Sequence, residues 1–230
     1  MKYAADLHIH SCLSPCSEDD MTPNNIINMA LIKGLDIIAV TDHNSGKNVE
    51  SVIEAAKNRI LVVPGIEVES KEEVHLLTYF RKLNDLKSFN HIISQNLPKI
   101  EIDTKIWGNQ IVMDSKDRKT GLVDNLLTTS TTLSLEEIFS IVRSLDGVVV
   151  PAHVDRGSYS IISNLGFIPE NLKVKTVEIM KKDSLKHPSI KHLNYIISSD
   201  AHFLGNILER IFFLDLKKLT IDEVIDNLIG

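Results

Sequence analysis

The chain has 230 residues, of which 43% are hydrophobic and 24% charged, and its net charge is −6. This length and composition suit a soluble α/β protein, and we expect residues 1–230 to form a single domain. The negative charge argues against broad electrostatic attraction to nucleic acid, so an extended nucleic-acid partner is not expected.

Nothing in the sequence indicates export or membrane insertion. The longest apolar runs, such as Ile60–Pro64 and Ile211–Leu214, are too short to span a bilayer. The first ten residues contain no apolar signal segment, and two cysteines do not make a disulfide framework. These features predict a cytoplasmic protein without a membrane partner, and they leave the oligomeric state open.

Short β-branched runs alternate with helical patterns along the chain, which predicts parallel strands with helices outside. Thr22 and Pro23 have the chemistry of a helix start, and that helix should stop at Gly34. Ser134 and Glu137 form a possible capping box. Other helices are expected at 48–57, at 88–96 and after Thr220. The expected strands are Tyr3–His8, Asp36–Val40, Ile60–Val63, Val74–Tyr79, Gly147–Pro151, Thr176–Met180, Tyr195–Ser198 and Ile211–Asp215.

Residues 97–132 interrupt this alternation. They carry scattered Gly, Asp, Lys and Thr residues, and the stretch MDSKDRKTG is typical of a hairpin or a mobile turn. We interpret the segment as an insertion over the mouth of the fold rather than a second domain. Trp107 within it either caps a pocket or only packs.

Histidines and carboxylates gather where the expected strands end. DLHIH places Asp6, His8 and His10 two residues apart, so the three side chains share one face of an extended strand. Two imidazoles on one face form a metal clamp, and Asp6 is placed to orient one of them by accepting its other N–H. Further motifs supply Asp42 and His43 (TDHN), Glu67 (GIEVE), His75 (EEVHLL), His153 and Arg156 (PAHVDR), and Asp200 and His202 (SSDAH).

This ordered series of motifs resembles the polymerase and histidinol phosphatase (PHP) family, in particular its stand-alone phosphoesterases, from Asp6 to His202. The resemblance implies a distorted (β/α)7 barrel with a metal site at the C-terminal ends of the strands. It also implies two or three divalent metal ions. In β/α barrels generally, active sites are built at that end of the strands.

The resemblance further implies which residues hold each ion. The first ion would be held by His8, His10, Glu67 and Asp200, and Glu67 would bridge to a second ion held also by His75 and His153. A third ion would use His43, His202 and a ligand after the HxH motif. Cys16 stands there, where some relatives have a ligating His, and Glu18, Asp19 or Asp20 are alternatives. Asp6 and Asp42 are expected behind these ligands, hydrogen-bonded to them.

Mixed imidazole and carboxylate ligands favour zinc, manganese or iron over magnesium or calcium. A bridging Glu67 would allow two ions roughly 3.5–4 Å apart, the separation used in phosphoryl transfer, with a metal-activated hydroxide as nucleophile. Arg156 is the expected catalytic cation for the phosphoryl oxygens. Alternatively, it pairs with Asp155 or with another acid at the rim.

The leading functional prediction is hydrolysis of a small phosphorylated substrate, such as a nucleotide, a sugar phosphate or histidinol phosphate. The first alternative is phosphodiester cleavage, including trimming of nucleic-acid 3′ ends. An amidohydrolase would usually need a lysine at a strand end, which these motifs lack. A non-catalytic metal-binding regulatory protein would be expected to have lost ligands.

Overall fold

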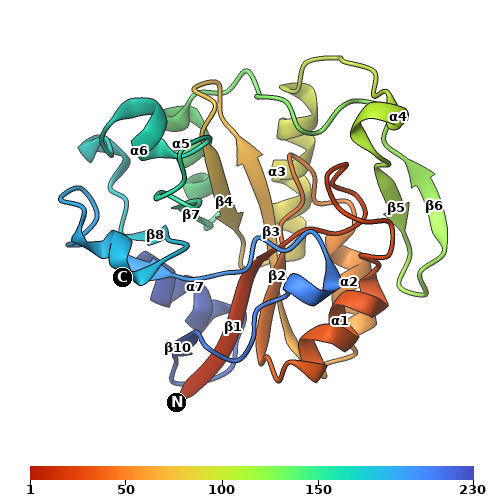
Figure 1. The fold of residues 1–230 in the computed structure, drawn as a ribbon, viewed down its shortest axis with the longest axis horizontal. Coiled ribbons are helices and arrows are strands. Elements are labelled where there is room, and N and C mark those ends of the chain that lie inside the picture. Colours follow the sequence, from red (N-terminus) through yellow and green to blue (C-terminus); the bar gives the residue numbers. More distant parts are fainter.

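The computed structural model describes the backbone of residues 1–230 and every side chain except those of residues 185 and 186. A curled six-stranded sheet forms its centre, in the order β10-β1-β2-β3-β4-β7 (Figure 1). Its strands are β1 Lys2–Ile9, β2 Ile37–Val40, β3 Leu61–Glu69, β4 His75–Tyr79, β7 Val148–Pro151 and β10 Phe213–Asp215. A separate parallel pair consists of β8 Thr176–Glu178 and β9 Asn194–Ile196.

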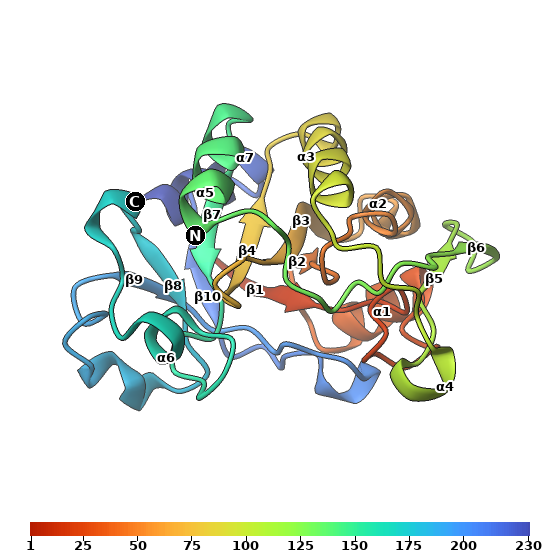
Figure 2. The same cartoon turned by 90° about the horizontal axis from the view of Figure 1, so that it is seen from above.

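Helices lie around this sheet (Figure 2). The α-helices are α1 Pro23–Ile32, α2 Val49–Ala56, α3 Leu83–Gln95, α4 Thr104–Trp107, α5 Leu135–Ser144, α6 Ile161–Leu165 and α7 Ile221–Ile229. Short 3₁₀ turns occur at Glu170–Leu172, Lys182–Lys186 and Leu204–Asn206. No helix among the described residues combines the length and the apolar character needed to cross a bilayer.

The expectation of an α/β protein is confirmed, and each of the eight expected strands is present with shifted ends. The strands are not all parallel, however. β1, β2 and β3 run parallel, whereas β4 is antiparallel to both of its neighbours and β10 is antiparallel to β1. Strand pairing within the described residues therefore gives a curled open sheet with a separate pair beside it, not a regular (β/α)7 barrel.

β3 continues six residues beyond the expected end at Val63 because it changes partners. It pairs with β2 up to Pro64 and with β4 from Gly65 onward. Proline cannot donate to a ladder, so it is tolerated at this exchange. Gly65 is required there, since a Cβ atom would lie 2.9 Å from Thr41 Cγ2 and 3.0 Å from the Tyr79 ring. Glu67 thus lies inside a strand pair.

Local capping explains the two clearest helix starts. The Thr22 side chain accepts a hydrogen bond from the Asn25 N–H at the start of α1, and Pro23 occupies the first turn. At α5 the complete capping box between Ser134 and Glu137 is present. Both helices bury their apolar faces against the sheet, in clusters that include Ile38 and Val149.

Residues 97–132 form α4 and an antiparallel hairpin of β5 Ile111–Met113 and β6 Lys119–Leu122, so the expected hairpin is confirmed. The segment lies beside α1 and α2 (Figure 1). Asn24 of α1 donates to the Ser115 carbonyl and to Asp117, and Ser51 of α2 donates to the Met113 carbonyl. These bonds hold the hairpin against α1 and α2.

Candidate metal centre

Glu67 is the centre of the predicted cluster and is almost completely buried. It is brought to the histidines by β3, and the adjacent β4 brings His75. Imidazole nitrogens surround its carboxylate: His75 Nδ1 at 2.9 Å, His43 Nδ1 at 3.0 Å, His10 Nε2 at 3.3 Å, and His8 Nε2 and His153 Nε2 at 3.4 Å. A single carboxylate therefore contacts five imidazoles.

His8, His10 and Asp200 form one group of convergent atoms. His8 Nε2 lies 3.1 Å from His10 Nε2, and Asp200 Oδ1 lies 3.1 Å from His10 Nε2 and 3.3 Å from His8 Nε2. Asp200 has a left-handed backbone with φ 51°, in a loop that follows β9. Buried imidazole nitrogens aimed at each other and at one carboxylate oxygen match the donors that bind zinc or a similar ion.

Two further groups share ligands with the first. His43, Glu67 and His75 offer atoms that all lie within 4.8 Å of one another, and His10, His43 and His202 do the same. His202 stacks on His10 with ring centroids 4.2 Å apart. The structure thus brings the nine predicted ligands to one end of the sheet, with Cys16 at the rim of the cleft beside His43 and His202.

Unpartnered buried atoms test whether these residues fit a metal. Glu67 Oε2 and both ring nitrogens of His153 are buried without a hydrogen-bond partner among the described residues. Buried polar atoms are almost always paired, so such orphans need an explanation. A cation between Glu67 and His153 would pair Glu67 Oε2 and one of the two ring nitrogens, so the donor set fits a divalent metal ion.

Electrostatics within the cluster are strongly coupled. Burial opposes ionisation of Glu67, but the imidazoles of His75, His8 and His43 hold its pKa well below the usual value. Burial opposes protonation of His8, yet the carboxylates of Glu178 and Glu67 raise its pKa well above the usual value. Without metal, protons on the histidines therefore balance the buried carboxylate.

Glu178 of β8 is a buried site residue that the sequence analysis did not identify. Its carboxylate lies 3.0 Å from His8 Nδ1, and the backbone N–H of His153 donates to it. It thereby turns His8 Nε2 toward the cluster, as outer carboxylates do in metal sites. The available signal was a lone acid within the apolar strand TVEIM.

Among the described side chains, Asp42 makes no hydrogen bond with a predicted ligand and reaches His10 only through Ser14. It accepts hydrogen bonds from Ser11 and from the Ser14 hydroxyl, and Ser14 Oγ lies 3.0 Å from His10 Nδ1. The expectation that Asp6 orients an imidazole is wrong. Its carboxylate instead accepts from the N–H and hydroxyl of Ser199 and from the Leu208 N–H, which fixes the loop that carries Asp200.

Arg156 pairs with Asp200, at 3.2 Å, and not with Asp155. The Asp155 carboxylate is occupied by the N–H groups of Met180 and Lys181 and by the Ser184 hydroxyl. The Arg156 side chain is about half exposed and lines the cleft above the cluster. The positively charged guanidinium of Arg156 therefore lies beside a predicted metal ligand, Asp200.

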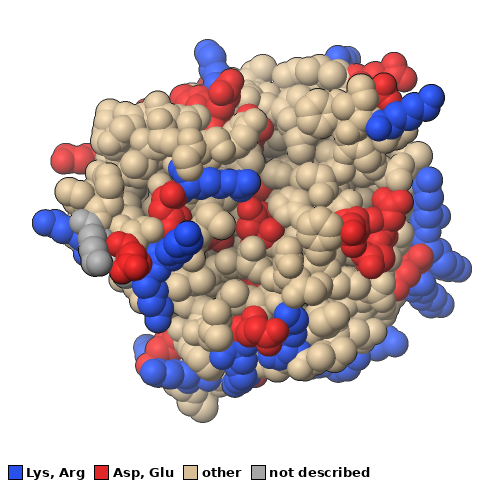
Figure 3. Space-filling view, viewed as in Figure 1, with Lys and Arg blue, Asp and Glu red and all other residues tan. Residues whose placement is uncertain are grey.

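The cleft has a volume of about 280 Å³ and is lined by Glu67, His75, Arg156, Asp200 and the aromatic residues Trp107 and Tyr159, among others. Figure 3 shows a hollow on this face with acidic side chains inside and basic side chains at its edge. Glu69 also reaches the cleft, but it accepts a hydrogen bond from Ser130 and lies 3.7 Å from His75. Glu67 is accordingly the central carboxylate.

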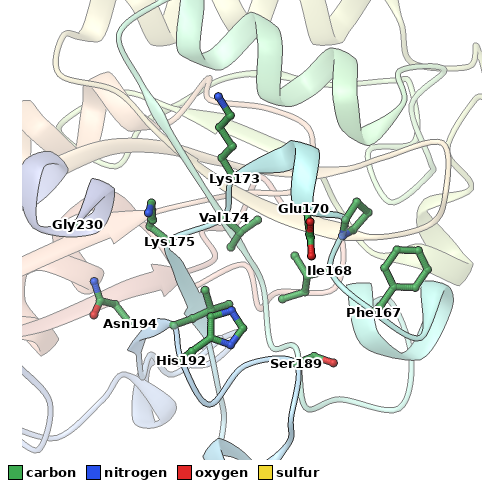
Figure 4. A pocket seen from close by; sticks show the side chains of 12 residues that line it. Phe167, Ile168, Glu170, Lys173, Val174, Lys175, Ser189, His192, Asn194 and Gly230 are labelled. Atoms are coloured by element: carbon green, nitrogen blue, oxygen red, sulfur yellow. The ribbon is translucent and has the colours of Figure 1, made fainter.

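A larger cavity of about 660 Å³ lies elsewhere, between the Glu170–Leu172 turn and β9 (Figure 4). It contains none of the predicted ligands. Its charged groups do not converge, because Lys173 extends away from His192 in Figure 4. The chemistry of the chain is therefore concentrated in the smaller cleft.

The PHP domain model matches residues 6–139. This range holds the N-terminal histidines, Glu67 and His75 and covers more than half of the chain. The chain belongs to the PHP domain family, as the sequence motifs predicted.

Comparison with known proteins extends the match to the whole fold. An uncharacterized protein of Methanocaldococcus jannaschii is 27% identical over 162 residues, covering 70% of this chain and 18% of that protein. The lesion-specific endonuclease Q of Pyrococcus furiosus superposes with a TM-score of 0.77 at 23% identity, covering 100% of this chain and 56% of the endonuclease. This chain therefore spans only part of the length of both.

A two-domain protein from Bacteroides vulgatus that contains a predicted PHP-like metal-dependent phosphoesterase superposes with a TM-score of 0.59. The identity is 16%, and the match covers 100% of this chain and 63% of that protein. The chain thus has the fold of PHP-family metal-dependent phosphoesterases. Family and neighbours together support a metal-dependent hydrolase in general.

We did not expect an extended nucleic-acid partner from the sequence, and this expectation is wrong. A structure of endonuclease Q in complex with a 27-mer duplex with an abasic lesion at the active site superposes with a TM-score of 0.70 at 20% identity. The match covers 98% of this chain and 56% of the endonuclease. Net charge is a property of the whole surface, whereas a DNA contact needs only local cations around a cleft. A net charge of −6 therefore does not exclude such a substrate.

Proposed function

We propose that this protein is a metal-dependent phosphoesterase that hydrolyses phosphodiester bonds in nucleic acid. The observation that carries the proposal is the buried carboxylate of Glu67, which contacts five imidazoles at the floor of a cleft open to solvent. Such a density of imidazole and carboxylate donors serves little purpose in a core without a metal, because each buried polar group must otherwise find a partner.

The proposed ligand sets overlap with the three groups of convergent atoms but are not identical to them, because His153 and Cys16 are added from their contacts with Glu67, His43 and His202. They are His8, His10, Asp200 and Glu67 for the first ion, Glu67, His75 and His153 for the second, and His43, His202 and Cys16 for the third. Zinc, manganese or iron in these sites would supply a hydroxide nucleophile and neutralise charge on the phosphate. The role of Glu178 is to hold the His8 ring in its metal-binding orientation.

Arg156 has a separate role in this proposal. Its guanidinium can exchange one contact with Asp200 for a planar, two-pronged contact with phosphoryl oxygens. Because the residue is partly exposed at the cleft, it can reach a substrate that stays outside the buried cluster. It thus positions the phosphate and stabilises the charge that develops on it.

Two observations favour a nucleic-acid diester as substrate. The chain matches, over its full length, the fold of an endonuclease, and the cleft combines cations at its edge with exposed aromatic rings. Stacking on aromatic rings and phosphate contacts are the usual means of binding single strands. A phosphodiester at the metal centre would place its nucleosides on the surrounding walls of the cleft.

The proposal is tested with the metal-loaded chain on matched substrates. We expect cleavage of a labelled single-stranded oligonucleotide and of bis(p-nitrophenyl) phosphate, and loss of both activities in Glu67→Gln and after chelation. Glu170→Gln, at an exposed 3₁₀ turn, is the control. Hydrolysis of p-nitrophenyl phosphate without cleavage of either diester would refute the proposed substrate class.

A further inference from the structure

Two aromatic side chains lie at the cleft without being part of the metal cluster. Trp107 is 49% exposed and Tyr159 is 45% exposed, yet both line the same cleft of about 280 Å³ as Glu67 and His75. A ligand bound in the cleft would therefore contact both rings as well as the polar cluster. The two rings come from distant parts of the chain, the 97–132 segment and the loop after β7.

Tyr159 is held in place by β4. Its ring stacks on the His75 imidazole with centroids 4.9 Å apart and an interplanar angle of 27°. Its carbonyl accepts a hydrogen bond from the His75 N–H. The backbone of Tyr159 has a φ of 56°, a conformation that costs a non-glycine residue energy. The fold thus imposes a strained backbone to present this ring beside a predicted metal ligand.

Trp107 is held in place by the loop that carries Cys16. It ends α4, and the next residue, Gly108, lies so close to Pro15 that a Cβ atom would clash with the Pro15 carbonyl oxygen. Asn109 donates to the Asp19 carboxylate in the same loop. About half of the Trp107 surface is exposed, so part of the indole is open to a ligand in the cleft.

We infer that Trp107 and Tyr159 are stacking platforms that hold an unpaired nucleobase beside the metal centre, which rests on the proposed cleavage of nucleic acid. Aromatic rings bind bases of any sequence through their π faces. A cavity of about 280 Å³ is at the small end of ligand pockets, so it suits one nucleotide and not a base pair. The preferred substrate is therefore a phosphodiester next to an unpaired base, in a single strand or a distorted duplex.

Tryptophan fluorescence tests this directly, because Trp107 is the only tryptophan of the chain. The metal-loaded protein is mixed in a stopped-flow instrument with a short single-stranded oligonucleotide, so that the signal is read before cleavage. The comparison is an oligonucleotide of equal length in which every base is replaced by a tetrahydrofuran abasic residue. We expect strong quenching by the first and little by the second. Equal quenching, or none at saturating oligonucleotide, overturns the inference.

Variants separate stacking from other effects. By fluorescence anisotropy of a labelled oligonucleotide, Trp107→Ala and Tyr159→Ala should each weaken binding on the order of 10-fold, and Trp107→Phe and Tyr159→Phe should keep most of it. Phe167→Ala, at a similarly exposed aromatic outside the cleft, is the control. Metal content measured in parallel shows whether Tyr159→Ala has disturbed His75. Alanine variants that bind like the unaltered protein would overturn the inference. Base-dependent quenching without any cleavage would instead refute the proposed function.

Discussion

His8 Nδ1 lies 3.0 Å from Glu178 Oε2, and both side chains are buried. A neutral imidazole has one N–H, and this contact places it on Nδ1. Once the ring has lost its second proton for metal binding, the free Nε2 faces Glu67 and Asp200, which lie 3.4 and 3.3 Å away. The Glu178 carboxylate on β8 therefore favours the tautomer of His8 on β1 whose Nε2 can bind a metal.

The first prediction follows from this contact. Glu178→Gln should lower metal affinity on the order of 10- to 100-fold, because it removes the charge that holds and polarises the His8 ring. Competition with a chromophoric chelator measures the affinity, and circular dichroism checks that the variant is folded. Glu170→Gln is the matched control at an exposed position. Equal affinities in the two variants would contradict the orienting role of Glu178.

The second prediction concerns the two cysteines. Partial burial opposes ionisation of Cys16, but hydrogen bonds with His202 and His43 lower its pKa to about 6. Burial raises the pKa of Cys12 to about 12. The thiolate is the nucleophile, so iodoacetamide should modify Cys16 but not Cys12 near neutral pH in the metal-free protein. The rate should fall as the pH drops below about 6, because the thiolate is then protonated.

Peptide mass spectrometry identifies the modified cysteine, and Cys16→Ser should abolish labelling. If Cys16 is the third-site ligand, loading with metal should slow its alkylation strongly. Cobalt substitution should also give a thiolate-to-metal absorption band that Cys16→Ser lacks. Unchanged alkylation of the fully loaded protein would exclude a metal–thiolate bond.

The histidine and carboxylate ligands could be predicted because they occur in short sequence motifs with a regular spacing. His8 and His10, or Asp200 and His202, stand two residues apart, and both pairs reach the cluster. What could not be predicted depends on long-range pairing. Glu178 meets His8 only because β8 packs near β1, 170 positions away in the chain. No local pattern records that contact.

The orientation of the Asp6 side chain could not be predicted for a different reason. Strict alternation along an extended strand put it on the same face as His8 and His10. The register between β1 and β2 shifts between Asp6 and Ile9, which interrupts that alternation. Ser199 and Leu208, brought in from the far end of the chain, then provide the partners of the carboxylate. The direction of β4 was likewise hidden, because parallel and antiparallel strands share one residue pattern.

The third prediction concerns Arg156. Arg156→Lys should lower kcat/KM for a phosphodiester on the order of 100-fold, because an ammonium cannot make the planar two-pronged contact of a guanidinium. Metal content should not change, since Arg156 contacts Oδ2 of Asp200, whereas Oδ1 faces His8 and His10. Arg118→Lys, in the exposed turn of the β5–β6 hairpin, is the control. Full activity of Arg156→Lys would leave Arg156 with a purely structural role.

The last prediction is that metal binding releases protons. Burial disfavours protonation of His43 and His75, yet the Glu67 carboxylate raises both pKa values, as Glu178 and Glu67 do for His8. Groups with raised pKa values keep their protons to higher pH, so His8, His43 and His75 hold protons near neutral pH in the metal-free protein, whereas burial keeps the pKa of His10 well below its usual value. A metal binds only the unprotonated nitrogens. The apparent affinity should therefore rise with pH until the pH passes those raised values.

Isothermal titration calorimetry in two buffers with different ionisation enthalpies gives the number of protons released. His43→Ala should release fewer protons than the unaltered protein, because one of the proton-holding imidazoles is gone. His91→Ala is the matched control, since His91 lies on the exposed side of α3 and contacts Gln95 instead of the cluster. Metal uptake with no proton release near neutral pH would contradict the mutual stabilisation of Glu67 and its histidines. A reduced release in His43→Ala, with an unchanged release in His91→Ala, would locate one exchangeable proton on the His43 imidazole beside Glu67.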